Sequence, residues 1–509
     1  MSRSLSFWGG LGLSLFVSLQ VRAQGREGTA MTVDPRAVVA LAAAHSPTLQ
    51  ASLLDFSSAR WTVHGLSAQY TPVFTLEANA TQTSTPNLFN ASRTRQVLTA
   101  ASVRKHLLWG TDVQLQLSAG VQDYSSNRGF GLTPGGSFGP GYGLTARLTL
   151  TQPLLRGRGR EVNEAELASA RITRTNAERR RDRVASEVIR DVLIAYWELW
   201  YATEAVGIHA QSREVARQQR DEASARVELG SLAPTDLLSF ERELSSREEE
   251  VLAAQQDRDN RQLELRRLVG VVEDGPDLSV QLEEAPSYPE PDPKLLEERA
   301  LTASPELRER KAELALAEQQ AKVAGDPNRH RLDVESYVQT QGLGNDDASA
   351  AWDQLAGFSN VSAFVGLTYE APLSSQQRRA DFAKARIAVE NAETALRATR
   401  QLTLTELRKS LASFAQGKGR LALAEKTAQL AEQQRVAEQA RFSTGSSTAL
   451  AVQEADAQHR QAKLRVARAQ ADLAEASLAL QHLSAGLLAA YADLGPAASA
   501  PAAAPSETP

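Results

Sequence analysis

The apolar residues of two long blocks repeat with the period of a coiled coil. Pro234 is the only proline between residues 154 and 275, and none occurs from 373 to 495. Strong helix formers dominate both blocks. Steps of three and four separate the seam positions Val452, Ala455, His459, Ala462, Val466, Ala469, Leu473, Ala476, Leu480 and Leu483. Each block is therefore predicted to form a long helix, a turn and a second long helix that pack as a coiled coil.

Other segments alternate apolar and polar residues with the period of a strand. This pattern occurs at residues 74–81, 113–121, 144–151 and 361–369. We expect these segments to form strands of about 9 to 11 residues, the length that a tilted strand needs to cross a bilayer. The side chains that we expect to face lipid are Phe74, Leu76, Leu144, Leu148, Leu150 and Ala363. A soluble sandwich would show the same alternation, and it remains an alternative at this point.

The first 23 residues have the pattern of an export signal. Arg3 supplies the positive charge, a mostly apolar stretch runs from Leu5 to Val21, and Ala23 ends a small-residue cleavage motif. No cysteine follows that could carry a lipid anchor, and no later run of 18 apolar residues could span a bilayer as a helix. The sequence therefore predicts an exported protein whose membrane contact, if any, is made by strands.

Three landmarks recur in the same order, which predicts an internal duplication. Residues 40–49 match 300–307, Gln152-Pro-Leu-Leu matches Ala371-Pro-Leu, and residues 225–231 match 440–446. The expected organisation is a first repeat at 24–272, a proline-rich linker at 273–293, a second repeat at 294–494 and a disordered Ala/Pro-rich tail at 495–509. The first repeat is longer on its strand side, where Val97–Tyr124 could form an additional hairpin.

The duplicated order of these motifs resembles the TolC-like outer-membrane efflux proteins. It includes Gln-Pro-Leu-Leu-Arg-Gly-Arg-Gly at 152–159 and Arg-Val-Glu-Leu-Gly-Ser at 226–231, and the resemblance covers roughly residues 33–490. It implies a fold that is mainly α with membrane β. In that fold a homotrimer forms one outer-membrane β-barrel, to which each chain gives four of twelve strands. A long α-helical coiled-coil barrel, internally duplicated, continues it into the periplasm.

The same resemblance implies a function and partners. Such a protein is the exit duct for efflux of small molecules (drugs, metabolites, metal ions) or for type I protein secretion. It docks with a periplasmic adaptor, also called a membrane fusion protein, and with an inner-membrane RND or ABC transporter. The alternative is a structural periplasmic coiled-coil protein without a transport role.

Composition and motifs give no support to an enzyme. A net charge of -5 and a pI of about 6.0 argue against a nucleic-acid binder, and the absence of cysteine excludes thiolate chemistry. No HExxH, Walker or Gly-x-Ser-x-Gly motif occurs. We therefore expect no catalytic residues, no cofactor and no metal ion.

The candidate functional residues lie at the two helical turns farthest from the strands, residues 229–238 and 444–452. Gly230 and Gly445 suit a reversal with positive φ, and Pro234 suits a first helical turn. Ser231, Thr235, Ser447 and Thr448 are expected to cap the returning helices. The residues expected to contact the adaptor at this periplasmic tip are Arg226, Gly230, Ser231, Asp236, Arg441, Gly445 and Thr448.

Overall fold

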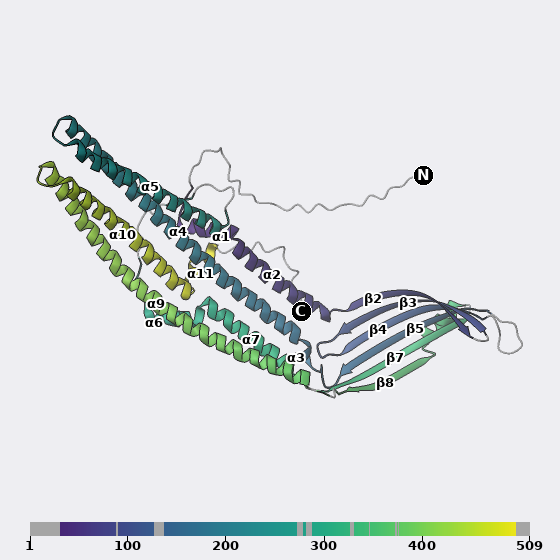
Figure 1. The fold of residues 1–509 in the computed structure, drawn as a ribbon. Coiled ribbons are helices and arrows are strands. Elements are labelled where there is room, and N and C mark those ends of the chain that lie inside the picture. Colours follow the sequence, from purple (N-terminus) through teal and green to yellow (C-terminus); the bar gives the residue numbers. More distant parts are fainter. Residues whose placement is uncertain are drawn as a thin grey trace, which may run out of the picture.

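The protein is a long rod of helices that ends in one antiparallel sheet (Figure 1). The computed structural model describes residues 31–494, apart from 88–89, 127–136, 272–277, 281–287, 326–329, 346, 372–373 and 375. The expected signal at 1–23, most of the linker at 273–293 and the tail at 495–509 lie outside the described residues. The α-helices are α1 (Pro35–His45), α2 (Pro47–Ser67), α3 (Arg160–Asn163), α4 (Ala165–Glu228), α5 (Pro234–Val269), α6 (Pro293–Ala303), α7 (Pro305–Gly325), α8 (Ala348–Ala356), α9 (Gln376–Ser443), α10 (Ala449–Leu483) and α11 (Gly486–Ala490).

Six strands form the sheet, in the order β2-β3-β4-β5-β7-β8. Their bounds are β2 (Val73–Asn87), β3 (Asn90–His106), β4 (Asp112–Ser126), β5 (Ser137–Pro153), β7 (Arg331–Asn345) and β8 (Val361–Glu370). The four strands implied by the resemblance are therefore too few, because the Val97–Tyr124 segment lies in the added hairpin β3–β4. The expected length of 9 to 11 residues is also wrong for every strand except β8, since the others have 15 or 17 residues.

The register of the sheet places the apolar alternation on one face. Phe74 pairs with Val103, Val103 with Leu115 and Leu115 with Leu148, and the ladder continues through Val338 to Ala363. Directly paired residues point to the same side of a sheet. The same parity places Leu76, Leu144 and Leu150 on this face. All six residues expected to face lipid therefore share one surface, and polar side chains such as Thr149 occupy the other.

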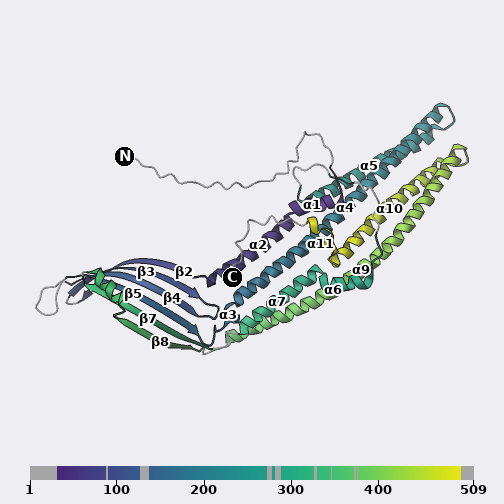
Figure 2. The same cartoon turned by 180° about the vertical axis from the view of Figure 1, so that it is seen from behind.

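The helices form two long hairpins, as the coiled-coil period predicts. Helices α4 and α5 have 64 and 36 residues, and α9 and α10 have 68 and 35. The seam of α10 is inside, with Val452 at 3% exposure and Leu473 at 4%. The two hairpins run side by side and turn at the end of the rod opposite the sheet (Figures 1 and 2).

The helices next to the sheet are arranged in the order of the strands that they continue. Helix α2 leads into β2, β5 leads through α3 into α4, α7 precedes β7, and β8 leads into α9. Helix α2 packs on α4, α4 on α7 and α7 on α9. Within the described part of the sheet, β3 and β4 alone are not continued by a helix at this end, because a tight turn at Leu107–Thr111 joins them directly.

The main hydrophobic core lies midway along the rod. Tyr196 and Trp197 of α4 are buried there against α1, α5 and α10, together with Leu265 and Ala471. A two-stranded parallel ladder of β1 (Met31–Val33) and β6 (Leu278–Val280) covers this core. Tyr196 and Trp197 therefore serve to pack the core. In the described part of the chain, no single helix is long and apolar enough to cross a membrane, whereas the bent pair α1 and α2 meets that criterion jointly.

Candidate functional site

The two hairpin tips are built by the same backbone motif. After α4, the amide of Ser231 donates to the carbonyl of Arg226 at 2.9 Å, and Gly230 has φ +69°. After α9, the amide of Ser446 donates to the carbonyl of Arg441 at 2.9 Å, and Gly445 has φ +77°. A six-to-one bond around a left-handed residue ends a helix where glycine avoids the Cβ clash. The expected reversals at both glycines are confirmed.

The returning helices begin differently from each other, and most of the expected caps are wrong. Thr448 does cap α10, because its hydroxyl accepts from the amide of Ala451 at 3.3 Å. Helix α5 instead has Ala233 at its N-cap and Pro234 in its first turn, without a side-chain cap. The hydroxyl of Ser447 is engaged elsewhere, donating to Glu438 at 2.8 Å. That of Ser231 donates back to the carbonyl of Arg226 at 3.0 Å.

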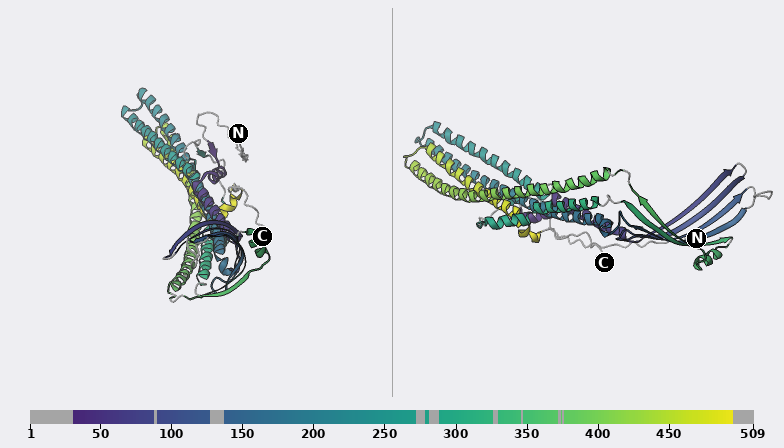
Figure 3. Two further views of the ribbon diagram at one scale, coloured as in Figure 1. Left: turned by 90° about the vertical axis from the view of Figure 1, so that its right-hand side faces the viewer. Right: turned by 90° about the horizontal axis from the view of Figure 1, so that it is seen from below.

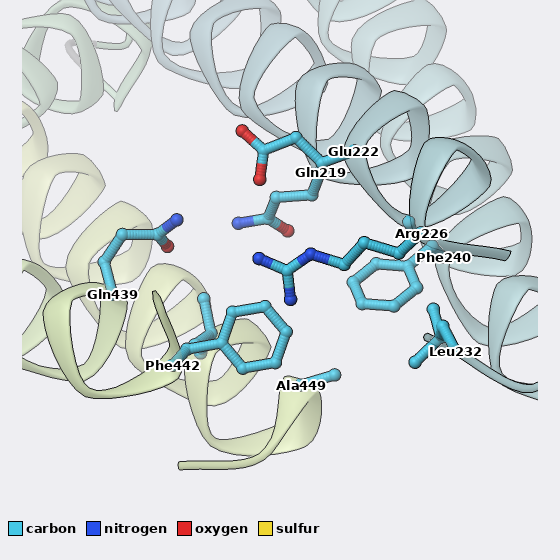
Figure 4. Close-up of a pocket in the computed structure, with 10 residues that line it drawn as sticks. Gln219, Glu222, Arg226, Leu232, Phe240, Gln439, Phe442 and Ala449 are labelled. Atoms are coloured by element: carbon cyan, nitrogen blue, oxygen red, sulfur yellow. The ribbon is translucent and has the colours of Figure 1, made fainter. Parts of the chain in front are cut away.

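The structure divides the expected tip residues into two groups. Arg226 points between the hairpins, and its guanidinium lies 5.3 Å from the ring centroid of Phe442 (Figure 4). Asp236 lies exposed in the first turn of α5, where a negative charge suits the helix dipole. Arg441 is also exposed and pairs with Glu438 at 3.0 Å. Arg226 therefore bridges the hairpins, whereas Asp236 and Arg441 present charge to solvent.

A small cleft between the hairpins surrounds the Arg226 side chain. Phe240 and Val452 form its buried floor, at 5% and 3% exposure. Gln219 and Gln439 line it from opposite hairpins (Figure 4). At the tips, the cation-π pair of Arg226 and Phe442 therefore joins the two hairpins over an apolar layer.

Polar contacts continue along the line where the hairpins meet, which we call the tip seam. Its members are Ser212, Gln219, Arg247, Glu250, Arg435, Asp456 and Arg460. The amide of Gln219 donates to Asp456 at 2.8 Å, and Arg435 lies 3.9 Å from the same carboxylate. Burial raises the pKa of Asp456, although the hydrogen bond from Gln219 opposes this. A carboxylate that is costly to ionise therefore sits between the hairpins.

A second group of charges lies farther from the tips in the same seam. Arg460 of α10 donates to Ser212 at 3.1 Å and lies 3.6 Å from Glu250 of α5. Burial and the neighbouring Arg247 lower the pKa of Arg460. Burial opposes ionisation of Glu250, but hydrogen bonding to Arg247 and the charge of Arg460 outweigh it and lower its pKa. In the tip seam the hairpins are therefore joined by hydrogen bonds and ion pairs, in addition to the apolar layer around Phe240 and Val452.

The sequence analysis did not single out Phe442, Phe240 or the charged pairs of the tip seam. A signal for the two aromatics was present, because they are the only Phe, Tyr or Trp residues in 210–270 and 420–480. The charged pairs carry no such signal, since Glu, Arg and Gln are abundant on every face of these helices. Among the described residues, no group of three or more His, Asp or Glu side chains could hold a metal ion.

Comparison with known proteins identifies the family. A family model described as outer membrane efflux protein matches residues 38–271 and 296–486. Among solved structures, CmeC, an outer membrane channel of Campylobacter jejuni, is 13% identical, with a TM-score of 0.66 over 97% of this chain and 98% of that chain. VceC, an outer membrane protein of Vibrio cholerae, is 16% identical, with a TM-score of 0.61 over 88% and 95%.

A third similar structure is the open state of MtrE, an outer membrane channel of Neisseria gonorrhoeae. It is 16% identical, with a TM-score of 0.62 over 89% of each chain. At these identities the structures show a shared fold. No curated protein sequence matches the chain. The family match, which covers most of the chain in two segments, favours a channel over a structural coiled-coil protein. The chain belongs to the outer membrane efflux protein family, whose members are channels of the outer membrane that extend into the periplasm and are not enzymes.

Proposed function

We propose that this protein is the outer-membrane exit duct of a tripartite efflux or type I secretion assembly. Three copies form the duct, an adaptor in the periplasm docks on the hairpin tips, and an RND or ABC transporter of the inner membrane loads the cargo. The sheet is the part embedded in the outer membrane, with its apolar face toward lipid. The transporter selects the cargo, because a water-filled duct discriminates little among molecules that fit.

The observation that carries this proposal is the construction of the tips. The tips lie at the opposite end of the rod from the sheet (Figure 1), where they would reach a periplasmic partner. Arg226 and Phe442 join the two hairpins, while Asp236 and Arg441 are exposed beside them. In this proposal the exposed charges and turn backbone meet the adaptor. The bridging contacts hold the resting aperture narrow until docking separates the hairpins.

The proposal is tested by changing the turns without changing the barrel. Gly230→Val or Gly445→Val places a branched Cβ at a positive φ with open space around it, so the turn is strained and the rest of the chain is untouched. We expect normal trimer levels in outer-membrane fractions but loss of dye efflux from cells that lack the wild-type copy. Gly419→Val is the matched control, because Gly419 lies in α9 with open space and no positive φ.

Two results would refute the assignment. One is undiminished efflux by either tip variant at normal trimer level. The other is a monomer in native mass spectrometry of the detergent-solubilised protein, where three mature copies should weigh about 160 kDa given a chain of 55.1 kDa.

A further inference from the structure

The two edge strands of the sheet have the properties of an interface. Among the described residues, β2 pairs with β3 alone and β8 pairs with β7 alone. Nine of the ten β8 residues are exposed, including Val365 at 74% and Leu367 at 69%, and Leu76 of β2 is exposed at 64%. Edges that stay unpaired are normally blunted by bulges, proline or lysine. β8 and the first 13 residues of β2 contain no proline or lysine, and their pairing shows no bulge.

Beyond Val361, the first residue of β8, the edge of the sheet is instead covered by another segment of the same chain. β8 reaches only Thr340 of β7, and α8 covers the remainder (Figure 3). The side chain of Gln354 accepts from the amide of Leu343 at 3.1 Å and donates to its carbonyl at 2.9 Å. The Gln354 amide thus satisfies the backbone groups that a longer β8 would have paired. A structure that closes this part of the edge and leaves β8 open indicates that β8 itself receives a partner strand.

The register of the sheet determines which residues such a partner would meet. A ladder of directly paired residues runs through Val73, Arg104, Gln114, Thr149, Tyr337 and Phe364. It begins at the first residue of β2 but meets β8 six residues before its last residue, Glu370. The stagger grows steadily across the sheet, because Pro153, the end of β5, lies four residues beyond Thr149. In a closed ring of several copies, the helix-proximal ends of all strands lie at the same height. The last residue of β8, Glu370, then lies opposite the first residue of β2, Val73, of the next copy.

The stagger also fixes the tilt of the strands. Six residues of about 3.3 Å each, over six strand spacings of about 4.8 Å, give a tilt of about 35°. That value lies within the range of outer-membrane barrels, roughly 35 to 45°. The register therefore already has the shear that a closed ring of such sheets requires.

On each face of the proposed junction, several of the resulting pairs match in chemistry. On the apolar face, Tyr369 would lie opposite Phe74 of the next copy, and Leu367 opposite Leu76. On the polar face, Thr368 would lie opposite Thr75, and Ser362 opposite Thr81. These four pairs join residues of like polarity, as cross-strand neighbours in a sheet with one dry face favour, whereas Glu370 opposite Val73 and Phe364 opposite Asn79 are mixed pairs.

We propose that β8 of one copy pairs antiparallel with β2 of the next in this register. Three copies then close a barrel of 18 strands, six from each copy. This proposal rests on the trimeric duct proposed above. Four helices per copy, α2, α4, α7 and α9, continue the strands, so twelve helices form the ring beneath the barrel.

With the added hairpin β3–β4, the strand barrel and the ring of twelve helices have about the same circumference. Eighteen strands tilted by about 35° have a circumference of about 105 Å. Twelve helices spaced about 8 to 10 Å apart have a circumference of roughly 100 to 120 Å. A barrel of twelve strands would be about one third narrower at the same tilt. The duct consequently does not narrow where helices give way to strands, and bulky cargo that traverses the helices leaves through the membrane without constriction.

The interface is tested by engineered disulfides, which are unambiguous in a chain without native cysteine. Thr75→Cys combined with Thr368→Cys should give covalent dimers and trimers on a non-reducing gel after oxidation of outer membranes. Each single variant should stay monomeric on that gel. The matched control combines Thr75→Cys with Ser362→Cys, which share the polar face but are displaced by six residues. At about 20 Å along the strand they lie beyond disulfide reach and should give no bond.

The possible outcomes separate the interface from the trimer. A bond in the control pair and not in the Thr368 pair would overturn the register. No bond in either pair, in a protein that native mass spectrometry shows to be a trimer, would overturn the edge pairing and leave the duct intact. A monomer would refute the proposed function itself. Electron cryomicroscopy of the trimer supplies the second measurement: equal backbone diameters of barrel and helical ring are expected, and a barrel narrower by one third would overturn the strand count.

Discussion

The carboxylate of Glu306 lies 3.1 Å from Nε2 of His482, which fastens the start of α7 to the end of α10. Nδ1 of the same ring lies 2.8 Å from the hydroxyl of Ser186 on α4. A serine, a histidine and a glutamate in contact could suggest a hydrolase, but Ser186 is 0% exposed between helices. Substrate has no access to this hydroxyl, and the three residues form a structural network that holds both repeats together.

This network predicts an acid-sensitive contribution to stability. Burial opposes ionisation of Glu306, but hydrogen bonds from His482 and Ser304 outweigh it and lower the pKa to about 2, from an ordinary 4.5. The ionised carboxylate therefore stabilises the fold above pH 4.5, and this stabilisation is lost as the pH falls toward 2. Glu306→Gln should destabilise the protein by roughly 2 kcal/mol at pH 7, with a smaller difference at pH 3.

Thermal unfolding followed by circular dichroism at the two pH values measures the effect. Glu313→Gln is the control, because Glu313 lies on the same helix in an exposed pair with Arg310 at 2.7 Å. Exposed pairs contribute about 0 to 1 kcal/mol, so this variant should unfold near the wild-type temperature at both pH values. Equal losses in the two variants would show that the Glu306 network carries no special stability.

Glu475 predicts the opposite pH dependence in the core midway along the rod. Burial and a hydrogen bond to Glu198 raise the pKa of Glu475 to about 7. Arg468 lies 2.8 Å from Glu198 and stabilises the ionised form of Glu198. The folded state then holds this proton more tightly than the unfolded state. The stability associated with it is present below pH 4.5 and is lost as the pH rises through 7. Glu475→Gln should gain roughly 1 to 2 kcal/mol relative to wild type at pH 8 and nothing at pH 5, as determined by urea unfolding. A pH-independent difference would contradict the assigned pKa.

The two faces of the sheet predict an asymmetric response to charge. Leu148 and Thr149 are neighbours on β5 with side chains on opposite faces. Leu148→Arg should cost about 2 kcal/mol or more, because it places a cation against lipid, whereas Thr149→Arg on the polar face should be tolerated. The yield of heat-stable trimer in outer-membrane fractions compares the two. Equal tolerance would contradict the assignment of the lipid face.

Gly270 predicts a steric requirement at the end of α5. It caps this helix with φ +84°, and a Cβ there would lie 2.4 Å from the carbonyl oxygen of His45. Gly270→Ala should therefore destabilise the protein by about 2 kcal/mol or more, since the backbone of His45 has to move. Gly207→Ala, in open space within α4, should instead stabilise it by about 0.5 to 1 kcal/mol. Chemical denaturation of both variants provides the test. A Gly270→Ala variant more stable than wild type would show that the backbone of His45 can move away at little cost.

The sequence alone determined the long helices, the turns between them and the apolar face of the sheet. Heptad spacing and the exclusion of proline set the lengths of α4 and α9, and the paired glycines set where each hairpin turns, because these are local properties of the backbone. Alternation likewise assigned Phe74 and Leu148 to one face before the register was known. The duplicated motifs gave the family resemblance that the family match confirms.

The tertiary structure alone decided how these elements meet. Strand number depends on pairing between distant segments, so β7 and the total of six strands were established only in the sheet, although the sequence had indicated an additional hairpin at Val97–Tyr124. Phe442 and Arg226 are 216 positions apart, and nothing local to either residue specifies the other. The same holds for Gln219 with Asp456 and for Glu306 with His482. The packing of the helices selects such partners. The sequence does not reveal them, because charged residues occur on every face of these helices. The stagger of the sheet, and with it the proposed closure, is a property of six strands together and of no single strand.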